Sequence, residues 1–192
     1  MFSSRHISRI VIVPVLTAVL PLMTACNRDP NVRKQKYLES GKRYETSGKY
    51  KEAAIQFSNA VKIDKNFAAA HYELAKTYLK LSNGNLAYAE LMRTVELQPS
   101  NQEARITLGN LLLAGGASPD RAAEQANAVL GLNPNSADAY ALLASVAQAK
   151  GDKEDASKNI QRAISLDPNR SGFHSALAVL QARNSNEGGA EQ

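Results

Sequence analysis

The spacing of a few small residues constrains the fold of this 192-residue chain most strongly. They recur in steps of 34, 34 and 35 residues, at Gly41, Ala75, Gly109 and Ala144. A period in this range is typical of stacked repeats, in which each unit buries its apolar face against the next. The sequence therefore predicts a linear scaffold that binds partners, and it argues against a catalytic pocket.

Each unit contains two runs of apolar and small residues at helical spacing. In the second unit, Ala75 and Tyr78 share one helical face, and Ala87 and Leu91 share another. Gly84-Asn85 separates the two runs, as expected for a turn. Each unit is thus predicted to be a helix A, a tight turn, a helix B and a short link.

Glycine and proline indicate where these helices end. Gly48 and Gly151 follow helix A of the first and fourth units, where a left-handed backbone costs glycine little. Asn133-Pro134 and Asp167-Pro168 are expected to end two B helices, because the residue before proline avoids the helical region.

Two helix starts and one longer turn are also predicted in the third unit. Ser118-Pro119 is typical of a cap followed by proline at the first helical position. Ser100 with Glu103 fits a capping box that would open helix A. The one extra residue of this unit falls in the turn at 115–118.

We call the residues at equivalent positions of successive units a column. The columns of this chain resemble those of the tetratricopeptide repeat family, whose 34-residue pattern combines small and aromatic positions on both helices. The first unit carries Tyr37, Gly41, Tyr44, Tyr50, Ala53, Phe57 and Ala60. The fourth carries Tyr140, Leu143, Ala144, Gly151, Ala156, Ile160, Ala163 and Pro168. Lys65, Thr94 and Ala126 depart from the pattern. Small columns let the helices approach closely, and aromatic columns fill the gaps between them.

The resemblance implies an all-α fold, an α-solenoid of about four helix-turn-helix repeats with a C-terminal capping helix. Residues 184–192 have few apolar groups to bury and are expected to form a disordered tail. The predicted segments are a signal peptide 1–25, a tether 26–33, repeats 34–67, 68–101, 102–136 and 137–170, a capping helix 171–183, and the tail 184–192.

The first 25 residues have the features of an export signal. Arg5 and Arg9 precede an apolar run that starts at Ile10 and ends in small residues. The run is shorter than the roughly 20 residues that a membrane-spanning helix needs, and Pro14 and Pro21 interrupt it. An uncleaved membrane anchor is the alternative interpretation.

The residues from Leu22 to Cys26 resemble the lipobox of bacterial lipoproteins, although Met23 replaces the usual leucine. That resemblance implies cleavage between Ala25 and Cys26 and acylation of Cys26, the one cysteine of the chain. Two or more acyl chains hold a protein stably on a bilayer. In that family the residue after the cysteine directs sorting, so the resemblance implies that Asn27 favours the periplasmic face of the outer membrane. An inner-membrane anchor is the alternative location in the bacterial cell envelope.

Charge is distributed unevenly along the chain. Residues 26–66 carry ten basic and five acidic residues, whereas residues 67–192 carry eleven and thirteen. The basic part adjoins Cys26, so it could contact anionic lipid headgroups. An ordinary solvated helix surface explains the same charges equally well. Nucleic-acid binding is not expected, because no cluster combines basic and aromatic residues.

No constellation of residues indicates catalysis, a cofactor, a metal or a small-molecule substrate. His71 and His174 occupy the same column of their units, where the family packs a bulky residue, so both are interpreted as packing residues. No histidines have metal-ligand spacing, and no phosphate-binding glycine loop is present. The sequence therefore predicts a protein that is not an enzyme.

The family binds peptides mainly along the concave face, with side chains of helix A. Carrying the repeat register across predicts a groove that is charged at its start and increasingly apolar along the stack. An extended or helical peptide with apolar anchors and some acidic character would suit it. The predicted lining is Leu38, Glu39, Lys42, Tyr72, Glu73, Lys76, Leu79, Lys80, Ile106, Asn110, Leu113, Ala141, Leu142 and Ser145.

The sequence is thus interpreted as a membrane-anchored, non-catalytic adaptor that binds a protein partner in an envelope assembly or export system. Small repeat lipoproteins of this kind are what it resembles. The alternative is a structural protein of the envelope whose repeats mainly mediate self-association.

Overall fold

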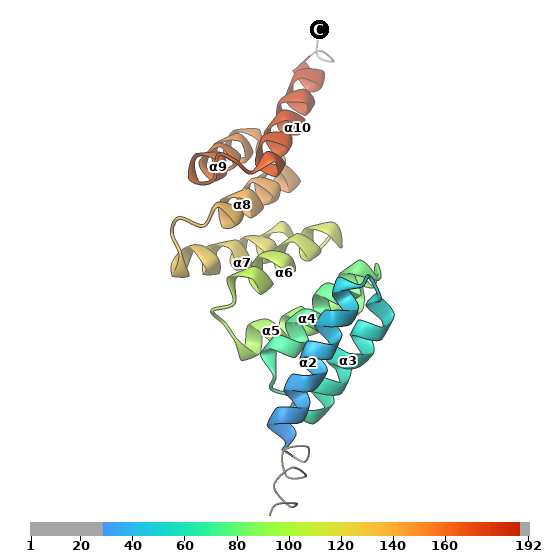
Figure 1. The fold of residues 1–192 in the computed structure, drawn as a ribbon. Helices are drawn as coiled ribbons and strands as arrows, with labels where there is room; N and C mark the ends of the chain where they lie inside the picture. Colours follow the sequence, from blue (N-terminus) through green and yellow to red (C-terminus); the bar gives the residue numbers. More distant parts are fainter. Residues whose placement is uncertain (1–28, 189–192) are drawn as a thin grey trace, which may run out of the picture.

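The computed structural model describes residues 29–188, which contain helices and no strand (Figure 1). Consecutive helices pair into antiparallel hairpins that stack along one axis, and α10 closes the far end. The all-α solenoid predicted from the repeat spacing is confirmed. The helices are α2 (Pro30–Thr46), α3 (Tyr50–Ile63), α4 (Ala68–Lys80), α5 (Gly84–Leu97), α6 (Gln102–Ala114), α7 (Pro119–Leu132), α8 (Ala137–Lys150), α9 (Lys153–Leu166) and α10 (Ser171–Gly188).

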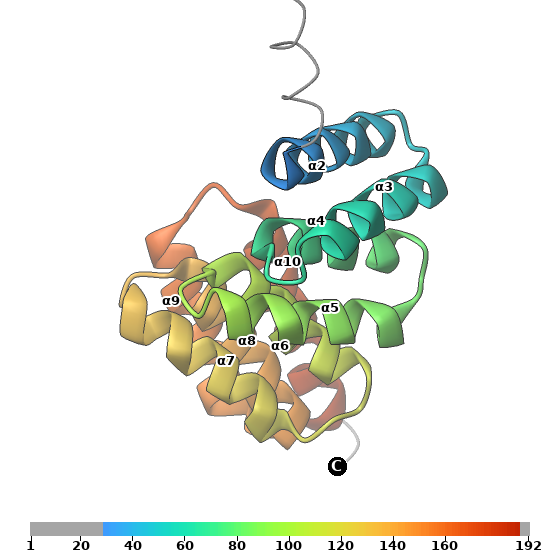
Figure 2. The ribbon, with the colours of Figure 1, turned by 90° about the horizontal axis from the view of Figure 1, so that it is seen from below.

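The two helices of each repeat take different places in the stack. In the third and fourth repeats, the A helices α6 and α8 lie nearer the middle of the view and the B helices α7 and α9 lie nearer its edge (Figure 2). We call the A helices, α2, α4, α6 and α8, the inner helices and the B helices the outer helices. Contacts between α2 and α4, and between α6 and α8, connect the inner helices of successive repeats. The A helices therefore line one side of the stack.

The core is a series of three clusters along the stack. One is built on Phe57, the next on Leu91 and Leu108, and the last on Ile160. All of their buried members lie between Leu38 and Leu180. All of the core that the described residues form therefore lies after residue 27, and the part of the chain from there onward is expected to fold without the residues before it.

Close approach within the stack depends on the small-residue column. A β-carbon added at Gly41 would stand 2.4 Å from the Phe57 ring, and one at Gly109 would stand 2.4 Å from a methyl group of Leu142. Both distances are far below van der Waals contact. Glycine occupies these two positions because the bulky side chains of Phe57 and Leu142 fill the space that a β-carbon would need.

The helix ends agree with most of the glycine and proline signals. Gly48 and Gly151 have positive φ angles of 71° and 80°, and Asn133 and Asp167 cap α7 and α9 before their prolines. The expected turn at Gly84-Asn85 is wrong, because Gly84 already begins α5. The preceding residues form the turn, since the Asn83 side chain accepts a hydrogen bond from the Leu86 amide.

One predicted helix start in the third unit is confirmed and the other is wrong. Ser118 caps α7 and Pro119 occupies its first turn. The expected capping box of Ser100 and Glu103 does not form. Instead Asn101 caps α6, and its side chain accepts a hydrogen bond from the Ala104 amide at 3.0 Å. Helix α6 therefore begins one residue later than predicted.

Both ends of the repeat array are longer than predicted. Helix α2 begins at Pro30 with Asp29 as its cap, so the residues up to Arg33 are helical and the tether is shorter than 26–33. Helix α10 continues to Gly188, so the expected disorder of 184–192 is wrong for 184–188. Extending an existing helix needs no new nucleation, which explains the added turn.

The predicted signal peptide at 1–25, its cleavage site and Cys26 lie outside the described residues, as does 189–192. None of the helices between residues 29 and 188 combines the length and the hydrophobicity of a membrane-spanning segment.

Candidate binding groove

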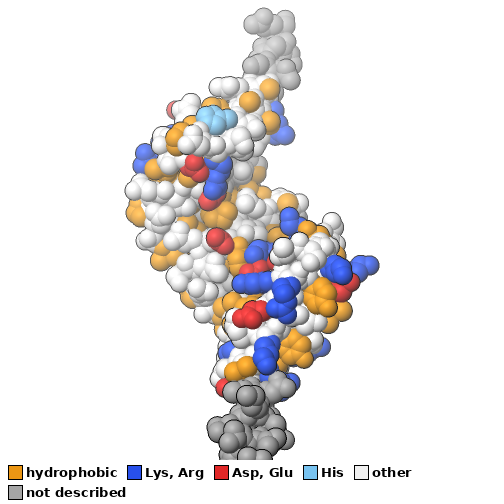
Figure 3. Space-filling view, viewed as in Figure 1, with side chains coloured by type: hydrophobic (Ala, Val, Ile, Leu, Met, Phe, Trp, Pro, Cys, Tyr) orange, Lys and Arg blue, Asp and Glu red, His pale blue; other side chains and the backbone are white. Residues whose placement is uncertain are grey.

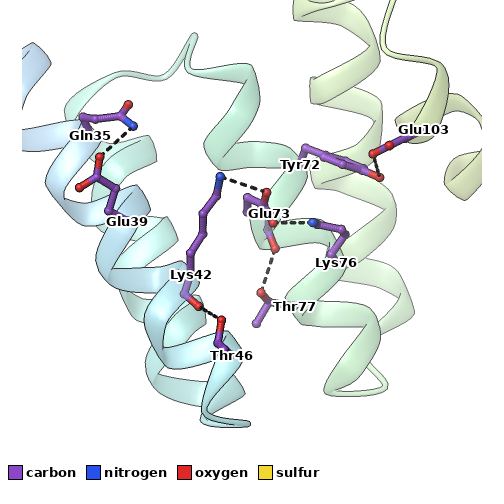
Figure 4. Close-up of polar contacts among 9 residues, drawn as sticks. All are labelled: Gln35, Glu39, Lys42, Thr46, Tyr72, Glu73, Lys76, Thr77 and Glu103. Carbon is purple, nitrogen blue, oxygen red and sulfur yellow. Dashed lines mark hydrogen bonds and ion pairs between the residues drawn. The ribbon is translucent and has the colours of Figure 1, made fainter.

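The inner surface carries a groove whose polar side chains connect one A helix to the next. Lys42 of α2 reaches Glu73 of α4, and Tyr72 of α4 reaches Glu103 of α6 (Figure 4). Further along, Arg170, just before α10, forms an ion pair with Asp138 of α8. We call this surface the inner groove.

Glu73 is the centre of the charge at the start of the groove. One carboxylate oxygen lies 2.6 Å from the Lys76 ammonium and the other 3.7 Å from the Lys42 ammonium. The Glu73 side chain is only 13% exposed, whereas that of Lys42 is 53% exposed. Lys42 is therefore the more accessible of the two cations, and its longer ion pair is the easier one to exchange.

The pKa of Lys76 is raised above its usual value. Burial opposes the charged form, but the hydrogen bond to Glu73 and the negative charges of Glu73 and Glu45 outweigh it. The Lys76 ammonium also lies 5.0 Å from the centre of the Tyr72 ring. Lys76 thus remains charged near neutral pH, and its contacts hold the Tyr72 ring in place.

Tyr72 stands at the junction between the charged and the apolar parts of the groove. Its hydroxyl donates a hydrogen bond of 3.2 Å to Glu103. Burial and the adjacent Glu103 charge raise the pKa of the Tyr72 hydroxyl. The hydroxyl therefore stays protonated and acts as a donor in the groove.

A central hollow of about 280 Å³ opens beside this tyrosine, between α4, α6 and α8. It combines the apolar side chain of Ile106 with the carboxylates of Glu103 and Asp138. The hollow is small and mostly polar, so it suits a single side chain that can accept or donate hydrogen bonds.

A larger distal hollow of about 480 Å³ lies between α8, α9 and α10. Arg170 lines it, so the ion pair between Arg170 and Asp138 stands between the two hollows. Most of its other lining side chains are small or apolar. They include Ala141, Ala144, Ser145, Ile160, Phe173, Ala176, Val179 and Leu180. This volume falls in the range typical of ligand pockets.

The structure brings some of the predicted groove residues together. Tyr72 and Ile106 line the central hollow, and Ala141 and Ser145 line the distal one. Other predicted residues surround Glu73 or lie on the exposed inner side of α2; these are Glu39, Lys42 and Lys76. Four more line neither hollow: Leu79, Lys80, Asn110 and Leu113.

Two predicted groove residues belong to the core instead. Leu38 is 4% exposed and packs in the cluster around Phe57. Leu142 is 2% exposed and fills the space over Gly109. The assignment of both side chains to the groove surface is therefore wrong, because each fills a gap between neighbouring helices.

Sequence reasoning missed several lining residues. Glu103 and Asp138 share one column, the second position of their A helices, so the register contained the signal for them. The side chains of α10, such as Ala176 and Val179, were missed because this helix was interpreted only as a cap.

The two histidines among the described residues differ in burial and in their contacts. His71 is buried, and its Nδ1 lies 2.5 Å from Glu90 while its Nε2 lies 3.0 Å from the Lys65 carbonyl. His174 is exposed and contacts the Pro168 carbonyl, so its interpretation as a packing residue is wrong. His71 packs against Glu90 of α5, the helix B of its own unit, whereas no described helix follows α10 to cover His174.

Neither histidine belongs to a metal site. Among residues 29–188, no group of three or more His, Cys, Asp or Glu side chains could hold a metal ion. The groove offers a polar hollow, an apolar hollow, hydrogen-bonding groups and ion pairs, which are the features of a binding surface.

Two family models match the chain. One, described as TPR repeat, covers residues 41–82, and the other, described as Tetratricopeptide repeat, covers residues 137–170. The chain contains tetratricopeptide repeats. Scaffolds of this type bind protein or peptide partners, which agrees with a groove made from the A helices.

The curated relatives share the repeats over part of their length. DnaJ homolog subfamily C member 3 from Bos taurus is 32% identical over 105 residues, which are 55% of this chain and 21% of that protein. The chain thus spans about a fifth of the length of the curated relatives that it matches.

Solved structures show the same solenoid. MamA 41-end from Desulfovibrio magneticus RS-1 aligns with a TM-score of 0.70 at 22% identity, over 83% of this chain and 89% of that chain. YrrB, described as a TPR protein with an unusual peptide-binding site, aligns with a TM-score of 0.67 at 26% identity, over 82% and 86%. Both support the repeat architecture.

Proposed function

We propose that the chain is a non-catalytic adaptor that binds a peptide segment of a partner protein along the inner groove. The observation that carries this proposal is the pair of hollows on successive inner helices, separated by the ion pair between Arg170 and Asp138. A peptide crossing both hollows meets polar groups first and an apolar surface next. The peptide-binding site named for YrrB supports this use of the fold.

The groove favours a peptide with an apolar anchor at one end and an acidic group at the other. The distal hollow accepts the anchor, because its small side chains leave space for it and most of its lining is apolar. An acidic group meets Lys42, whose ion pair with Glu73 is long and exposed. Lys76 contributes less to this preference, since Glu73 and the Tyr72 ring already surround it.

A peptide panel tests this directly on the fragment 27–192. The panel consists of 12-residue peptides that vary the apolar anchor and the acidic group, with binding followed by fluorescence anisotropy. Ser145→Trp fills the distal hollow and is expected to weaken binding of anchored peptides at least tenfold. Leu132→Trp, at an exposed site on the outer helix α7, is the matched control and is expected to leave binding unchanged. Equal binding by both variants would contradict the groove assignment.

We further propose that the adaptor is a lipoprotein of the bacterial cell envelope, acylated at Cys26 and held at the periplasmic face of the outer membrane. The lipobox-like sequence before Cys26 and the export-type features of residues 1–25 support this. An inner-membrane anchor is the alternative. The adaptor would present its groove to a partner in an assembly or export system.

The lipid anchor is tested with the full chain in a bacterial host. Wild type is expected to incorporate an alkyne-labelled palmitate, to fractionate with membranes and to lose residues 1–25. Cys26→Ser is expected to lose the label and the membrane association. If the variant is still cleaved, labelled and membrane-bound, the lipoprotein assignment is wrong.

A second candidate function is self-association through the last helix. Val179 of α10 is 50% exposed beside the distal hollow, so a second copy could cover it. Light scattering of the fragment 27–192 separates the two functions. A mass that stays monomeric as concentration rises favours the adaptor, whereas a concentration-dependent dimer that Val179→Asp abolishes favours self-association.

A further inference from the structure

The outward face of α2, at the start of the stack, differs from the equivalent face of every later repeat. Arg33, Lys36, Ser40 and Arg43 lie along one side of the helix, at spacings of three and four residues. A hollow of about 420 Å³ lies on this side. We define the terminal face as Arg33, Lys36, Tyr37, Ser40, Arg43 and Gln56.

Later repeats bury the same columns against their neighbours. Where the first unit has Lys36 and Ser40, the second has Ala70 and Leu74, and both of these are buried against the first unit. Stacking another repeat on the terminal face would bury Lys36 without water, which is unfavourable for a charged side chain. The terminal face therefore ends the stack and suits a polar partner.

Basic residues outnumber acidic residues on α2. Of its two acidic residues, Glu45 acts on the charge of Lys76 in the groove, and Glu39 contacts Gln35 on the same helix. Its cations Arg33 and Arg43 are exposed, and neither forms an ion pair with any residue that the structure describes. The terminal face is therefore cationic.

The space-filling view shows where the basic side chains of the first repeat gather (Figure 3). Lys and Arg side chains gather over α2 and α3 on the face turned to the viewer, with fewer acidic side chains among them (Figure 3). Over the later repeats in the same view, positive and negative side chains are sparser. The excess positive charge is thus a local property of the first repeat.

We propose that the terminal face docks on the anionic phosphate headgroups of a membrane. The inference rests on the proposed lipid anchor, because only Asn27, Arg28 and Asp29 separate Cys26 from the start of α2. At about 3.3 Å per residue, this tether reaches on the order of 10 Å. That is close to the Debye length of about 8 Å at physiological ionic strength, so the cations remain within the field of the headgroups.

This docking orients the stack on the membrane. Helix α2 lies along the surface with the terminal face toward the lipid, and the later repeats extend away from it. Each cation near an anionic surface contributes on the order of a fivefold gain in binding. Three cations together contribute on the order of a hundredfold, which would not hold the protein alone but would fix its orientation once it is anchored.

The test uses sedimentation with vesicles and the fragment 27–192, which carries the three core clusters of the described residues. Vesicles of phosphatidylcholine with 30% phosphatidylglycerol are compared with phosphatidylcholine alone. The variant with Arg33→Gln, Lys36→Gln and Arg43→Gln is expected to bind the anionic vesicles about a hundredfold less tightly than wild type. The matched control removes the same charge from α9 through Lys153→Gln, Lys158→Gln and Arg162→Gln, and is expected to change binding less than threefold.

Several results would overturn the proposal. They are equal binding to neutral and anionic vesicles, an equal loss in the α9 variant, and a dimer of the fragment that the terminal-face substitutions dissociate. Circular dichroism of both variants checks that they fold. Labelling of Cys26 in the full chain reports on the anchor separately, so failure of the anchor and failure of the docking surface give different results.

Discussion

The ring of Phe57 lies against the α-carbon of Gly41, in the space where any other residue would place its β-carbon. A β-carbon there would stand 2.4 Å from the ring, and Phe57 itself is fully buried. The ring has no free space to move into, because interiors are close-packed. This contact explains why the repeat needs glycine at Gly41, whereas Ala75 is accommodated at the same position of the next unit.

Gly41→Ala is therefore expected to lower the free energy of unfolding by about 1–3 kcal/mol, the usual cost of overpacking a core. Urea denaturation of the fragment 27–192 measures the change. Gly131→Ala is the matched control, because Gly131 also lies within a helix but nothing stands within 4 Å of its added β-carbon. That substitution is expected to stabilise by up to about 1 kcal/mol through helix propensity.

The buried pair of His71 and Glu90 predicts a pH dependence of stability. Burial disfavours the charged imidazole, but hydrogen bonds to Glu90 and to the Lys65 carbonyl, together with the Glu90 charge, raise the pKa of His71 above 6.5. A raised folded-state pKa means that the stabilisation is fully present below the unfolded pKa and is lost as pH rises through the folded pKa.

The free energy of unfolding is thus expected to fall, relative to that of His71→Gln, as pH rises from about 6 through the folded pKa. Urea denaturation across this range gives the difference. In Glu90→Gln no carboxylate opposes the effect of burial on the pKa of His71. The decrease of the unfolding free energy with rising pH is therefore expected to disappear or change sign. A wild-type profile parallel to that of His71→Gln would contradict this prediction.

Asn101 caps the start of α6, whereas its neighbour Ser100 does not. Asn101→Ala removes the hydrogen bond to the Ala104 amide and is expected to cost about 1 kcal/mol. Ser100→Ala is expected to change the stability by less than about 0.5 kcal/mol, because it lies outside the cap. Thermal denaturation of both variants gives the comparison. Equal losses of stability would show that Ser100 also caps α6, as in the expected capping box.

Glu73→Gln is expected to change the groove more than the fold. It removes the carboxylate that holds Lys76 and Lys42, so the pKa of Lys76 is expected to fall. The loss of stability is expected to be about 1 kcal/mol or less, since both lysines remain partly solvated. Titration of the Lys76 side chain by NMR, together with urea denaturation, measures both quantities. An unchanged pKa of Lys76 would show that Glu73 does not hold it.

The period and the small columns predicted the fold because both follow from packing between units. A repeat register places Gly41 and Phe57 correctly, since every unit must solve the same packing problem. It places Leu38 and Leu142 wrongly in the groove because local gaps differ between units. Leu142 turns inward to occupy the space that Gly109 leaves open.

The ends of helices were harder to predict from the register than the columns. Asp29-Pro30 has the form of a cap followed by a proline, but it lies before the first repeat as the period defines it. Ser100 and Asn101 are both good caps, and only the backbone decides between them. The distal hollow needed the position of α10, which no repeated column specifies.

Site-specific crosslinking tests the central claim, binding along the inner groove, most directly. A photoreactive phenylalanine derivative replaces Ile106 in the central hollow, or Ile55, which is 58% exposed on the outer helix α3, as the control. Irradiation of cells carrying the full chain is expected to give a discrete adduct from position 106 that is absent at position 55. The adduct is expected to be lost when Ser145→Trp fills the distal hollow. An adduct of the same size from both positions, or none from position 106, would contradict the account.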